Sequence, residues 1–501
     1  MMKSLPENAP IRYSWKKRKE KVNNVNQANE SNQSKELSVA DLDRKARYVV
    51  LFLILSGVFW LLFGTLLALL ASIKMHLPDW LGSAGWLTFG RVRPLHLNTM
   101  VYGWASLTGA GVALWMLSRL LKVPILLRGY IIAAGAIWNI ALLVGSIQIL
   151  AGFSRGIEWL EFPVSTMVVI VLCVIIMSAS VILMVVTRSV RQLYVSVWYI
   201  IAAFLWFPLL GLVSSLPIFD TPTVQAGMNW WYAHNALGLW FTPIGLAAAY
   251  YFIPKVLGRP IYSYGLSLLG FWGLALFYNW NGFHHLIGSP LPTWFVTISI
   301  AASVMMIIPV VVVAVNHHMT VVGSFSAVKY SPTLRFVVFA AMSYTFVSLQ
   351  GSMQALRSAN EVIHFTHFVV AHAHIGMYAF VTMMLFGACY YILPRITLRE
   401  WHSKKLIKWH FWLTAIGIII YAGALQGIGI FQGFAMNDPD VPFTDTVTMT
   451  IPYLVARSAS GILMTAGHLI FAWLLIRMVF QPGEQPSSPL IWDKIRKEFA
   501  L

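Results

Sequence analysis

Long apolar runs are the feature of this sequence that most limits what it can fold into. A membrane-spanning helix needs about 20 predominantly apolar residues, whereas a membrane-spanning strand needs only about ten. Twelve runs near the helical length lie approximately at 48–73, 95–120, 129–152, 164–187, 194–216, 229–253, 262–288, 292–315, 333–355, 366–392, 407–432 and 449–480. The runs therefore predict an all-α, polytopic membrane protein with twelve transmembrane helices.

Composition agrees with this prediction and excludes a soluble protein. The chain is 58% hydrophobic and only 11% charged, whereas soluble domains are roughly 45–50% apolar and about 25% charged. Its net charge of +17 comes from basic residues in a polar N-terminal segment and in short loops between the runs. Membrane topology explains this basic excess, so no nucleic-acid partner is expected.

The distribution of polar residues divides the chain into three segments. Residues 1–46 are basic, rich in Asn, Gln and Ser, and poor in apolar residues, which is typical of a disordered tail and not of a cleaved signal peptide. Residues 47–482 contain the twelve predicted helices, and residues 483–501 form a second polar tail.

The loops predict the orientation. Those after even-numbered runs carry the basic residues Arg119, Lys122, Arg128, Lys255, Arg259, Lys329, Arg395, Arg399, Lys404 and Lys405. The loops on the other side are acidic or neutral, apart from Arg91 and Arg93. Because cytoplasmic loops carry an excess of Lys and Arg, both tails are predicted to be cytoplasmic.

Six of the fourteen histidines are predicted to meet in the outer half of the membrane. They are His96, His234, His284, His285, His372 and His374. The second, sixth and tenth helices run inward and the seventh runs outward, which brings all six to one depth. Ionisable side chains inside a membrane are costly and usually functional, so the six predict a metal centre.

The other histidines have ordinary interpretations. His317 and His410 lie near cytoplasmic helix ends, where an exposed imidazole costs little. His468 lies within the last helix and is expected to be a hydrogen-bonded packing residue.

The spacing of His372 and His374 separates their roles. Residues two apart on a helix point about 200° apart, so these two side chains do not share one metal. Each suits one of two haems that flank the helix. His96 suits the second axial position of one haem, which leaves the other haem with an open face.

His234, His284 and His285 are three further imidazoles at the same depth. Such a donor set suits copper, zinc or iron and leaves one position free for a substrate. Tyr278 lies seven residues before His285 and is therefore expected on the same helix face, beside this metal.

A polar stripe continues inward from Tyr278. Ser267 and Tyr264 precede Tyr278 by eleven and fourteen residues, close to multiples of the helical repeat. The stripe indicates a proton path to the cytoplasmic end, which Tyr250 on the neighbouring helix can join.

The chain resembles the catalytic subunit of haem–copper oxidases, and most closely the C family of cbb-type cytochrome c oxidases, through RVRPLHLN, WWYAHNALG, YYFIPKVLGRPIYSYGLS, YNWNGFHH and HFTHFVVAHAHIG. The resemblance covers about residues 91–480. It implies that the two haems are of type b and that the third metal is copper B. The implied ligands are His96 and His374 for a low-spin haem, His372 for a high-spin haem, and His234, His284 and His285 for copper.

The resemblance also implies roles for residues around the metals. Tyr278 would be covalently bonded to His234. A proton path would pass through Tyr250, Ser267 and Tyr344, and Arg457 would neutralise haem propionates.

The implied activity is that of a terminal respiratory oxidase in the bacterial cytoplasmic membrane, which reduces O2 to water and takes protons from the cytoplasm. The chain has only two cysteines, Cys173 and Cys389, both in apolar runs. They provide neither a haem c attachment motif nor a dinuclear copper site. Separate membrane-anchored cytochrome c subunits are therefore implied as electron donors.

Two departures from the family pattern leave an alternative open. Gln350 replaces a glutamate of the ninth helix, and His367 replaces an aspartate that typically precedes the tenth-helix histidines. The segment around His367 resembles nitric oxide reductases, so NO reduction is the alternative. Those reductases carry a glutamate four residues after the sixth-helix histidine and hold iron there, whereas this chain has Gly238, which favours copper and O2. A permease that binds no haem is an alternative from another class.

Overall fold

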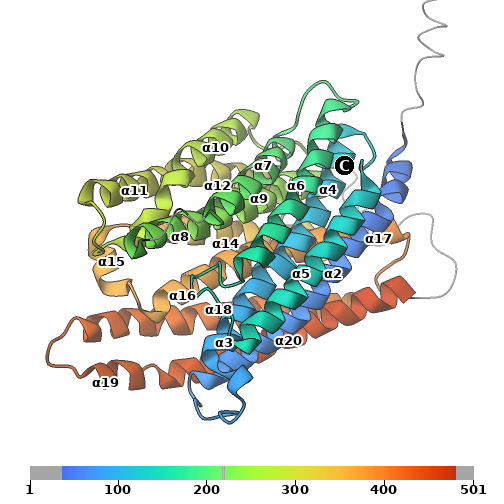
Figure 1. The fold of residues 1–501 in the computed structure, drawn as a ribbon. Coiled ribbons are helices and arrows are strands. Elements are labelled where there is room, and N and C mark those ends of the chain that lie inside the picture. Colours follow the sequence, from blue (N-terminus) through green and yellow to red (C-terminus); the bar gives the residue numbers. More distant parts are fainter. Residues whose placement is uncertain (1–36, 217, 219–220, 481–501) are drawn as a thin grey trace, which may run out of the picture.

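The computed structural model describes residues 37–216, 218 and 221–480, which form a bundle of helices with no strand among them (Figure 1). The α-helices are α2 (Val39–Lys74), α3 (Phe89–Asn98), α4 (Ser106–Leu121), α5 (Arg128–Ala151), α6 (Val164–Val186), α7 (Val195–Ser214), α8 (Pro222–Ala236), α9 (Thr242–Leu257), α10 (Tyr264–Phe277), α11 (Thr293–Met305), α12 (Ile307–Val321), α13 (Phe325–Tyr330), α14 (Pro332–Gln354), α15 (Arg357–Ile363), α16 (His367–His374), α17 (Met383–Thr397), α18 (Lys404–Met436), α19 (Phe443–Thr448) and α20 (Ile451–Phe480). Two segments are 3-10 helices, η1 (Gly85–Leu87) and η4 (Tyr278–Leu286). Three are π-helices, η2 (Thr99–Ala105), η3 (Leu237–Phe241) and η5 (Ile375–Thr382).

The first helix begins earlier than the sequence predicts. α2 starts at Val39, so residues 39–46 are helical although they were assigned to the N-terminal tail. Ser38 caps the helix, because its side chain accepts a hydrogen bond from the backbone N–H of Asp41. Asp43 is buried and pairs with Arg119 at 2.7 Å, a tertiary contact that the polar composition did not reveal. Residues 1–36 and the predicted tail 483–501 lie outside the described residues.

Eleven helices among the described residues are long and apolar enough to cross a membrane, rather than the twelve predicted. The difference lies in the seventh run, 262–288, where the 14-residue helix α10 continues as the 3-10 helix η4. η4 approaches α8 so closely that a Cβ on Gly282 would lie 2.3 Å from the carbonyl oxygen of Trp230. α10 and η4 together have a contour length of about 39 Å at 1.5 and 2.0 Å per residue, so this run still exceeds the roughly 30 Å hydrocarbon core.

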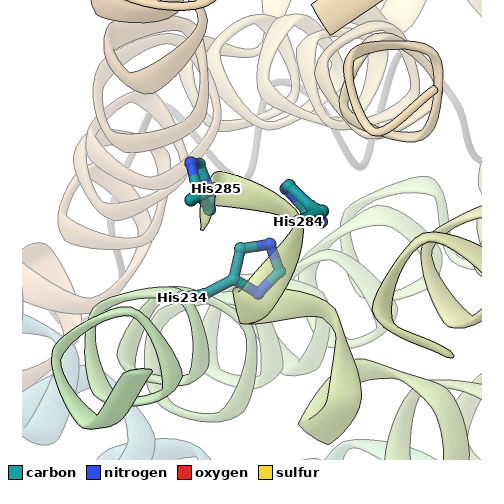
Figure 2. Close-up of side chains that lie close together, drawn as sticks. All are labelled: His234, His284 and His285. Carbon is teal, nitrogen blue, oxygen red and sulfur yellow. The ribbon is translucent and has the colours of Figure 1, made fainter. Parts of the chain in front are cut away.

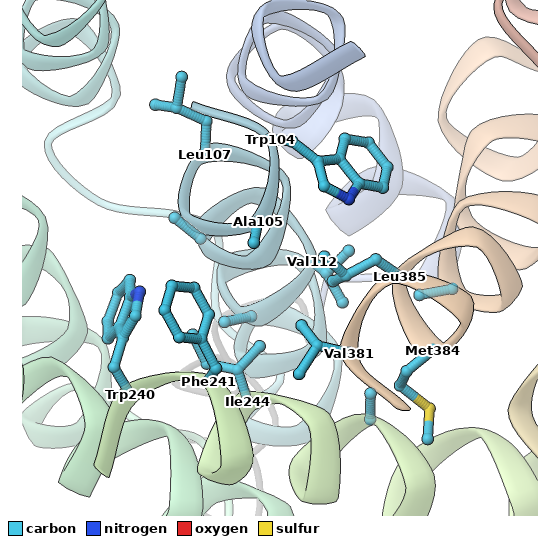
Figure 3. Packing of buried hydrophobic residues seen from close by; sticks show 14 of the residues in the cluster. Trp104, Ala105, Leu107, Val112, Trp240, Phe241, Ile244, Val381, Met384 and Leu385 are labelled. Carbon is cyan, nitrogen blue, oxygen red and sulfur yellow. The ribbon is translucent and has the colours of Figure 1, made fainter. Parts of the chain in front are cut away.

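Three spans form the centre of the bundle. In Phe89–Leu121, Pro222–Leu257 and His367–Thr397, 94% of the most apolar window is buried, whereas the other spans reach 44 to 67%. Large side chains from all three interlock, among them Trp104 and Phe241 (Figure 3). The remaining helices surround this centre; α18 and α20, for example, pack side by side along its edge (Figure 1).

Candidate metal centres

Each central span changes from an α-helix to a π-helix close to its histidines. η2 begins three residues after His96, η3 three residues after His234, and η5 directly after His374. A π segment inserts an extra residue into the helical turn and is frequent at functional sites. The directions of the side chains around the helix axis therefore shift between the half of each span that carries the histidine and the half that packs in the core.

His234 on α8 lies against His284 and His285 on η4 (Figure 2). One ring nitrogen of each residue lies within 4.8 Å of the other two. Nitrogens bound to one metal through bonds of about 2.0 Å lie about 3–4 Å apart. The cluster is thus close to the geometry of a three-imidazole metal site.

The neighbours of these rings leave ligand atoms available. Ser303 donates its hydroxyl hydrogen to the carbonyl of Ser299, so Nδ1–H of His284 must donate to Ser303 Oγ, 2.8 Å away. That tautomer leaves Nε2 of His284 unprotonated and able to accept a metal. Nδ1 of His234 is buried without a hydrogen-bond partner, and a bound metal would satisfy it. The ring of His285 stacks on Trp230 at 4.0 Å.

His96 and His374 form a second site between α3 and α16. Their ring centres are 6.5 Å apart and their planes differ by 13°. Two imidazoles bound to opposite sides of one metal at about 2.0 Å have ring centres a little over 6 Å apart. Nδ1 of His96 donates to the carbonyl of Gly64, and Nδ1 of His374 donates to the carbonyl of Val370, each at 2.8 Å. Nε2 is therefore the unprotonated nitrogen of each ring and is able to accept a metal, although the hydroxyl of Tyr421 lies 3.3 Å from Nε2 of His374.

His372 lies in different surroundings from His374, as the helical spacing predicts. Its Nδ1–H donates to Oε1 of Gln350 on α14 at 3.0 Å, which leaves Nε2 unprotonated and able to accept a metal. The sequence identified Gln350 only as a departure from a family pattern. Its hydrogen bond to a residue 22 positions away was not predictable from either motif.

A small cavity joins His372 to the three-histidine cluster. It has a volume of about 80 Å³, and its lining includes His234, His284, His372, Tyr278 and Tyr344. A cavity needs only about 10–15 Å³ on this measure to hold one water molecule, so this one has room for a diatomic molecule and a few waters.

Tyr278 packs against His234, with ring centres 4.7 Å apart at 30°. The predicted reason for its position was wrong: Tyr278 and His285 do not share an α-helical face, because residues 278–286 form a 3-10 helix. Its ring instead lies on Gly238 of η3, where a Cβ would be 1.7 Å from Tyr278 Cε1. Only glycine at position 238 leaves room for the tyrosine.

The predicted proton-path residues are distributed between two cavities. Tyr344 lines the small cavity, whereas Tyr250 and Tyr264 line a wide cavity at the other end of the bundle. Ser267 is buried between them on α10, and its hydroxyl donates to the carbonyl of Tyr264. Asn316 donates to the hydroxyl of Tyr250 at 3.4 Å. Among the described residues these four side chains do not hydrogen-bond to one another, so a path through them needs water.

Arg457 on α20 lies beside the His96–His374 pair. Its guanidinium is 5.6 Å from the ring centre of Tyr421, whose hydroxyl is 3.3 Å from Nε2 of His374. Nε of Arg457 is buried and has no hydrogen-bond partner. A half-buried guanidinium with an unsatisfied N–H fits an anionic group such as a haem propionate. His367 begins α16, and its backbone N–H donates to Gln432 Oε1.

Arg93 is an exception to the positive-inside rule, and nearby carboxylates neutralise its charge. It pairs with Glu158 and, at 3.3 Å, with Glu161 in the loop between α5 and α6. Glu161 also accepts from Nδ2 of Asn98 at 2.8 Å. Burial is the largest influence on this carboxyl and raises the pKa of Glu161 to about 7.

Three histidines were predicted to lie outside the metal centres: His468 as a hydrogen-bonded packing residue, and His317 and His410 as exposed residues. The prediction for His468 is confirmed, and the predictions for His317 and His410 are wrong. His468 is hydrogen-bonded as expected, to Thr65 at 2.7 Å and to Tyr378 at 2.8 Å. His317 and His410 are buried rather than exposed. Nδ1 of His410 lies 2.8 Å from the hydroxyl of Tyr390, and the ring of His317 packs 4.3 Å from that of Tyr250. These polar partners come from other helices and were not visible in the local sequence.

Residues 48–463 match the family model described as cytochrome c and quinol oxidase polypeptide I. The chain is 30% identical to cytochrome c oxidase subunit 1 of Rhodobacter capsulatus, over 87% of this chain and 85% of that protein. It is 29% identical to the cbb3-type cytochrome c oxidase subunit CcoN1 of Stutzerimonas stutzeri, over 87% of this chain and 94% of that one. A heme–copper terminal oxidase dimer solved by cryo-EM has the same fold, with a TM-score of 0.70 and 17% identity over 88% of this chain and 85% of that chain.

We expect Gly238→Ala to lower the thermal unfolding temperature by several degrees, because the new methyl group overlaps Tyr278 and overpacking costs about 1–3 kcal/mol. Gly227→Ala on α8 is the matched control, because its Cβ would meet only Phe283, at 4.0 Å. Thermal unfolding of both purified variants checks this. Equal unfolding temperatures would show that Tyr278 does not occupy the space above Gly238.

Proposed function

The chain belongs to the cytochrome c and quinol oxidase polypeptide I family, and on that premise we propose that it is the catalytic subunit of a terminal respiratory oxidase that reduces O2 to water. The observation that carries the proposal is the small cavity shared by His372, His234 and His284 beside Tyr278. A haem with an open face beside a three-imidazole metal suits a diatomic substrate.

The six histidines would hold three metals. His96 and His374 would bind a low-spin haem b, His372 a high-spin haem b, and His234, His284 and His285 copper B. The 6.5 Å separation of the His96 and His374 rings and the unsatisfied Nδ1 of His234 support this assignment. When bound, these groups supply electrons and the coordination position for O2.

Protein hydrogen bonds would fix the direction of the ligand atoms. The backbone carbonyls of Gly64 and Val370 orient His96 and His374, and Ser303 orients His284. Metal-ligating histidines usually donate their second N–H in this way, which fixes the tautomer and the ring plane. Arg457 would neutralise a propionate and so favour retention of a haem.

Tyr278 would act directly in the reaction. Reduction of O2 to two water molecules takes four electrons and four protons, and the phenol can supply one of each beside the cavity. A covalent bond from its ring to His234 would use one imidazole nitrogen and leave the other for copper. Forming that bond releases two electrons and two protons, which O2 accepts. The ring contact of 4.7 Å supports the proposed bond.

Protons would enter from the cytoplasm through Tyr264, Tyr250, Ser267 and Tyr344. Support comes from the two cavities, since Tyr250 and Tyr264 line the wide one and Tyr344 lines the small one. Bridging water molecules would connect the hydroxyls. In the proposed topology both chain ends are cytoplasmic and the wide cavity opens on the proton-uptake side.

Electrons would come from separate, membrane-anchored cytochrome c subunits. Cys173 and Cys389 are both buried among apolar helices and belong to no haem c attachment motif. NO reduction is the less favoured activity. Nitric oxide reductases that hold iron in place of copper would have a glutamate at the position of Gly238, where even a Cβ would overlap Tyr278.

Histidine substitutions should separate the three metals. His96→Ala and His374→Ala should abolish the low-spin haem signal, because each removes one of two axial ligands. His234→Ala, His284→Ala and His285→Ala should each lower copper content and spare that signal. Visible spectra and metal analysis of the purified variants check this, with the exposed residue His402→Ala as control. An unchanged low-spin haem spectrum in the His96 and His374 variants would contradict their assignment as axial ligands. Stoichiometric copper in all three variants of the His234 cluster would contradict the proposed copper site.

Tyr278→Phe keeps the ring that packs on Gly238 and removes only the hydroxyl. Haem and copper contents should therefore persist, whereas O2 turnover should fall by about 100-fold or more, as expected for loss of a group that transfers a proton. Mass spectrometry of the native protein should also find the peptide of Tyr278 bonded to that of His234. Near-native O2 consumption by the variant would eliminate the proposed role.

Gln350→Glu should lower the reduction potential of the haem on His372. A carboxylate accepts the Nδ1–H bond more strongly than an amide oxygen and increases electron donation by the imidazole. Gln354→Glu, one turn further along α14, adds the same group without a bond to His372. Redox titration of both variants measures the effect, and equal potentials would contradict a positioning role for Gln350.

A further inference from the structure

The proposed proton path has a gap between its two cavities. Tyr250 and Tyr264 line the wide cavity and Tyr344 lines the small one, and these hydroxyls do not hydrogen-bond to one another among the described residues. Protons cross such a gap only through further polar groups or water, because apolar side chains neither accept nor donate them. Two buried polar atoms of neighbouring helices lie in this region, the hydroxyl of Tyr199 on α7 and Nε2 of His317 on α12.

Tyr199 lies against Tyr250 and against α10. Its ring is nearly parallel to that of Tyr250, with the ring centres 5.9 Å apart and the planes at 16°. Its hydroxyl reaches α10 at Gly270, where a Cβ would lie 3.6 Å from the hydroxyl oxygen. Gly270 is one turn after Ser267 and about two turns before Tyr278. The hydroxyl of Tyr199 therefore lies between these two residues along the direction of α10.

His317 lies at the level where the path passes from Tyr250 to Tyr344. Its ring centre is 4.3 Å from that of Tyr250 on α9, and the two planes differ by 64°. The next residue, His318, has Nε2 3.0 Å from the hydroxyl of Thr345, which directly follows Tyr344 on α14. α12 therefore carries His317 at the point where α9 and α14 present their tyrosines.

Both polar atoms are buried and have no hydrogen-bond partner among the residues that the structure describes. An unpaired polar group in a protein interior is costly, and an ordered water molecule usually satisfies it. Each group can also pass a proton on. A phenol hydroxyl accepts one hydrogen bond and donates another, and a neutral imidazole takes up a proton at one ring nitrogen and releases one from the other. The side chain then ends with the charge with which it began.

We propose that Tyr199 and His317 carry protons between the wide and the small cavity, each through a water molecule bound at its unpaired atom. The proposal rests on the proposed oxidase activity, which consumes protons at the small cavity. Packing alone does not account for the two residues, because phenylalanine or leucine would fill the same space without leaving a polar atom unpaired.

A high-resolution cryo-EM map of the intact complex tests the water positions without reference to turnover. Density for a water molecule is expected within about 3.2 Å of the Tyr199 hydroxyl and of Nε2 of His317. Lack of such density at one atom would remove that residue from the path, and lack of it at both, in a map that resolves other buried waters, would overturn the proposal.

Proton uptake tests the transfer itself. Tyr199→Phe and His317→Leu keep apolar bulk and remove the proton-carrying atoms. Tyr390→Phe and His410→Leu are the matched controls, since this buried, hydrogen-bonded pair on α17 and α18 lines neither cavity. The fully reduced complex is mixed with O2, and a pH-indicator dye follows proton uptake.

Uptake should slow about ten-fold in each path variant, less than the roughly 100-fold expected for loss of a general acid, because the remaining group still carries protons. Haem content and the low-spin haem spectrum should match the wild type, which separates slow proton transfer from a packing defect. Uptake at the control rate in both path variants, or equal slowing in the controls, would overturn the proposal. A wild-type complex that consumes no O2 would instead contradict the proposed oxidase activity, and the water positions would still be judged from the map.

Discussion

The rest of the structure depends on holding six imidazoles in the interior of a helical bundle. A buried polar ring needs a partner for each nitrogen, because lipid provides none. In four of the six residues Nδ1 has a protein partner: Gly64 for His96, Ser303 for His284, Gln350 for His372 and Val370 for His374. Of the other ring nitrogens, Nδ1 of His234 is buried without a partner, and a metal bound at the three-histidine cluster would satisfy it.

Packing in the central helices fixes where those nitrogens point. In the three central spans 94% of the most apolar window is buried, whereas in the other spans 44 to 67% of that window is buried. Their π segments change the helix rotation beside the histidines. Close approaches at Gly238 and Gly282 then bring η4 onto α8, so that Tyr278, His284 and His285 all meet His234.

Much of this arrangement was predictable from the sequence, because it depends on the lengths of the apolar runs and on the helical spacing of residues. Apolar run lengths predicted eleven of the spans, and helix direction predicted that His96 and His374, and His234, His284 and His285, lie together. A two-residue spacing correctly separated His372 from His374, which have different neighbours. The seventh run was mispredicted because its glycine and asparagine residues adopt a 3-10 helix that only contact with α8 explains.

Contacts between distant helices account for the other misses. Burial of His317 and His410 depends on tyrosines of neighbouring helices, and the early start of α2 depends on Asp43 reaching Arg119. The bond from His372 to Gln350 likewise joins α16 to α14. No local pattern encodes such pairs, since each partner is an ordinary residue in its own helix.

The most direct test of the account is parallel O2 and NO turnover by one purified preparation of the native complex whose haem and copper contents have been quantified. The account predicts two haems b and one copper for each copy of this chain, with O2 consumed faster than NO. A haem-free protein, or iron in place of copper with NO consumed faster than O2, would contradict it.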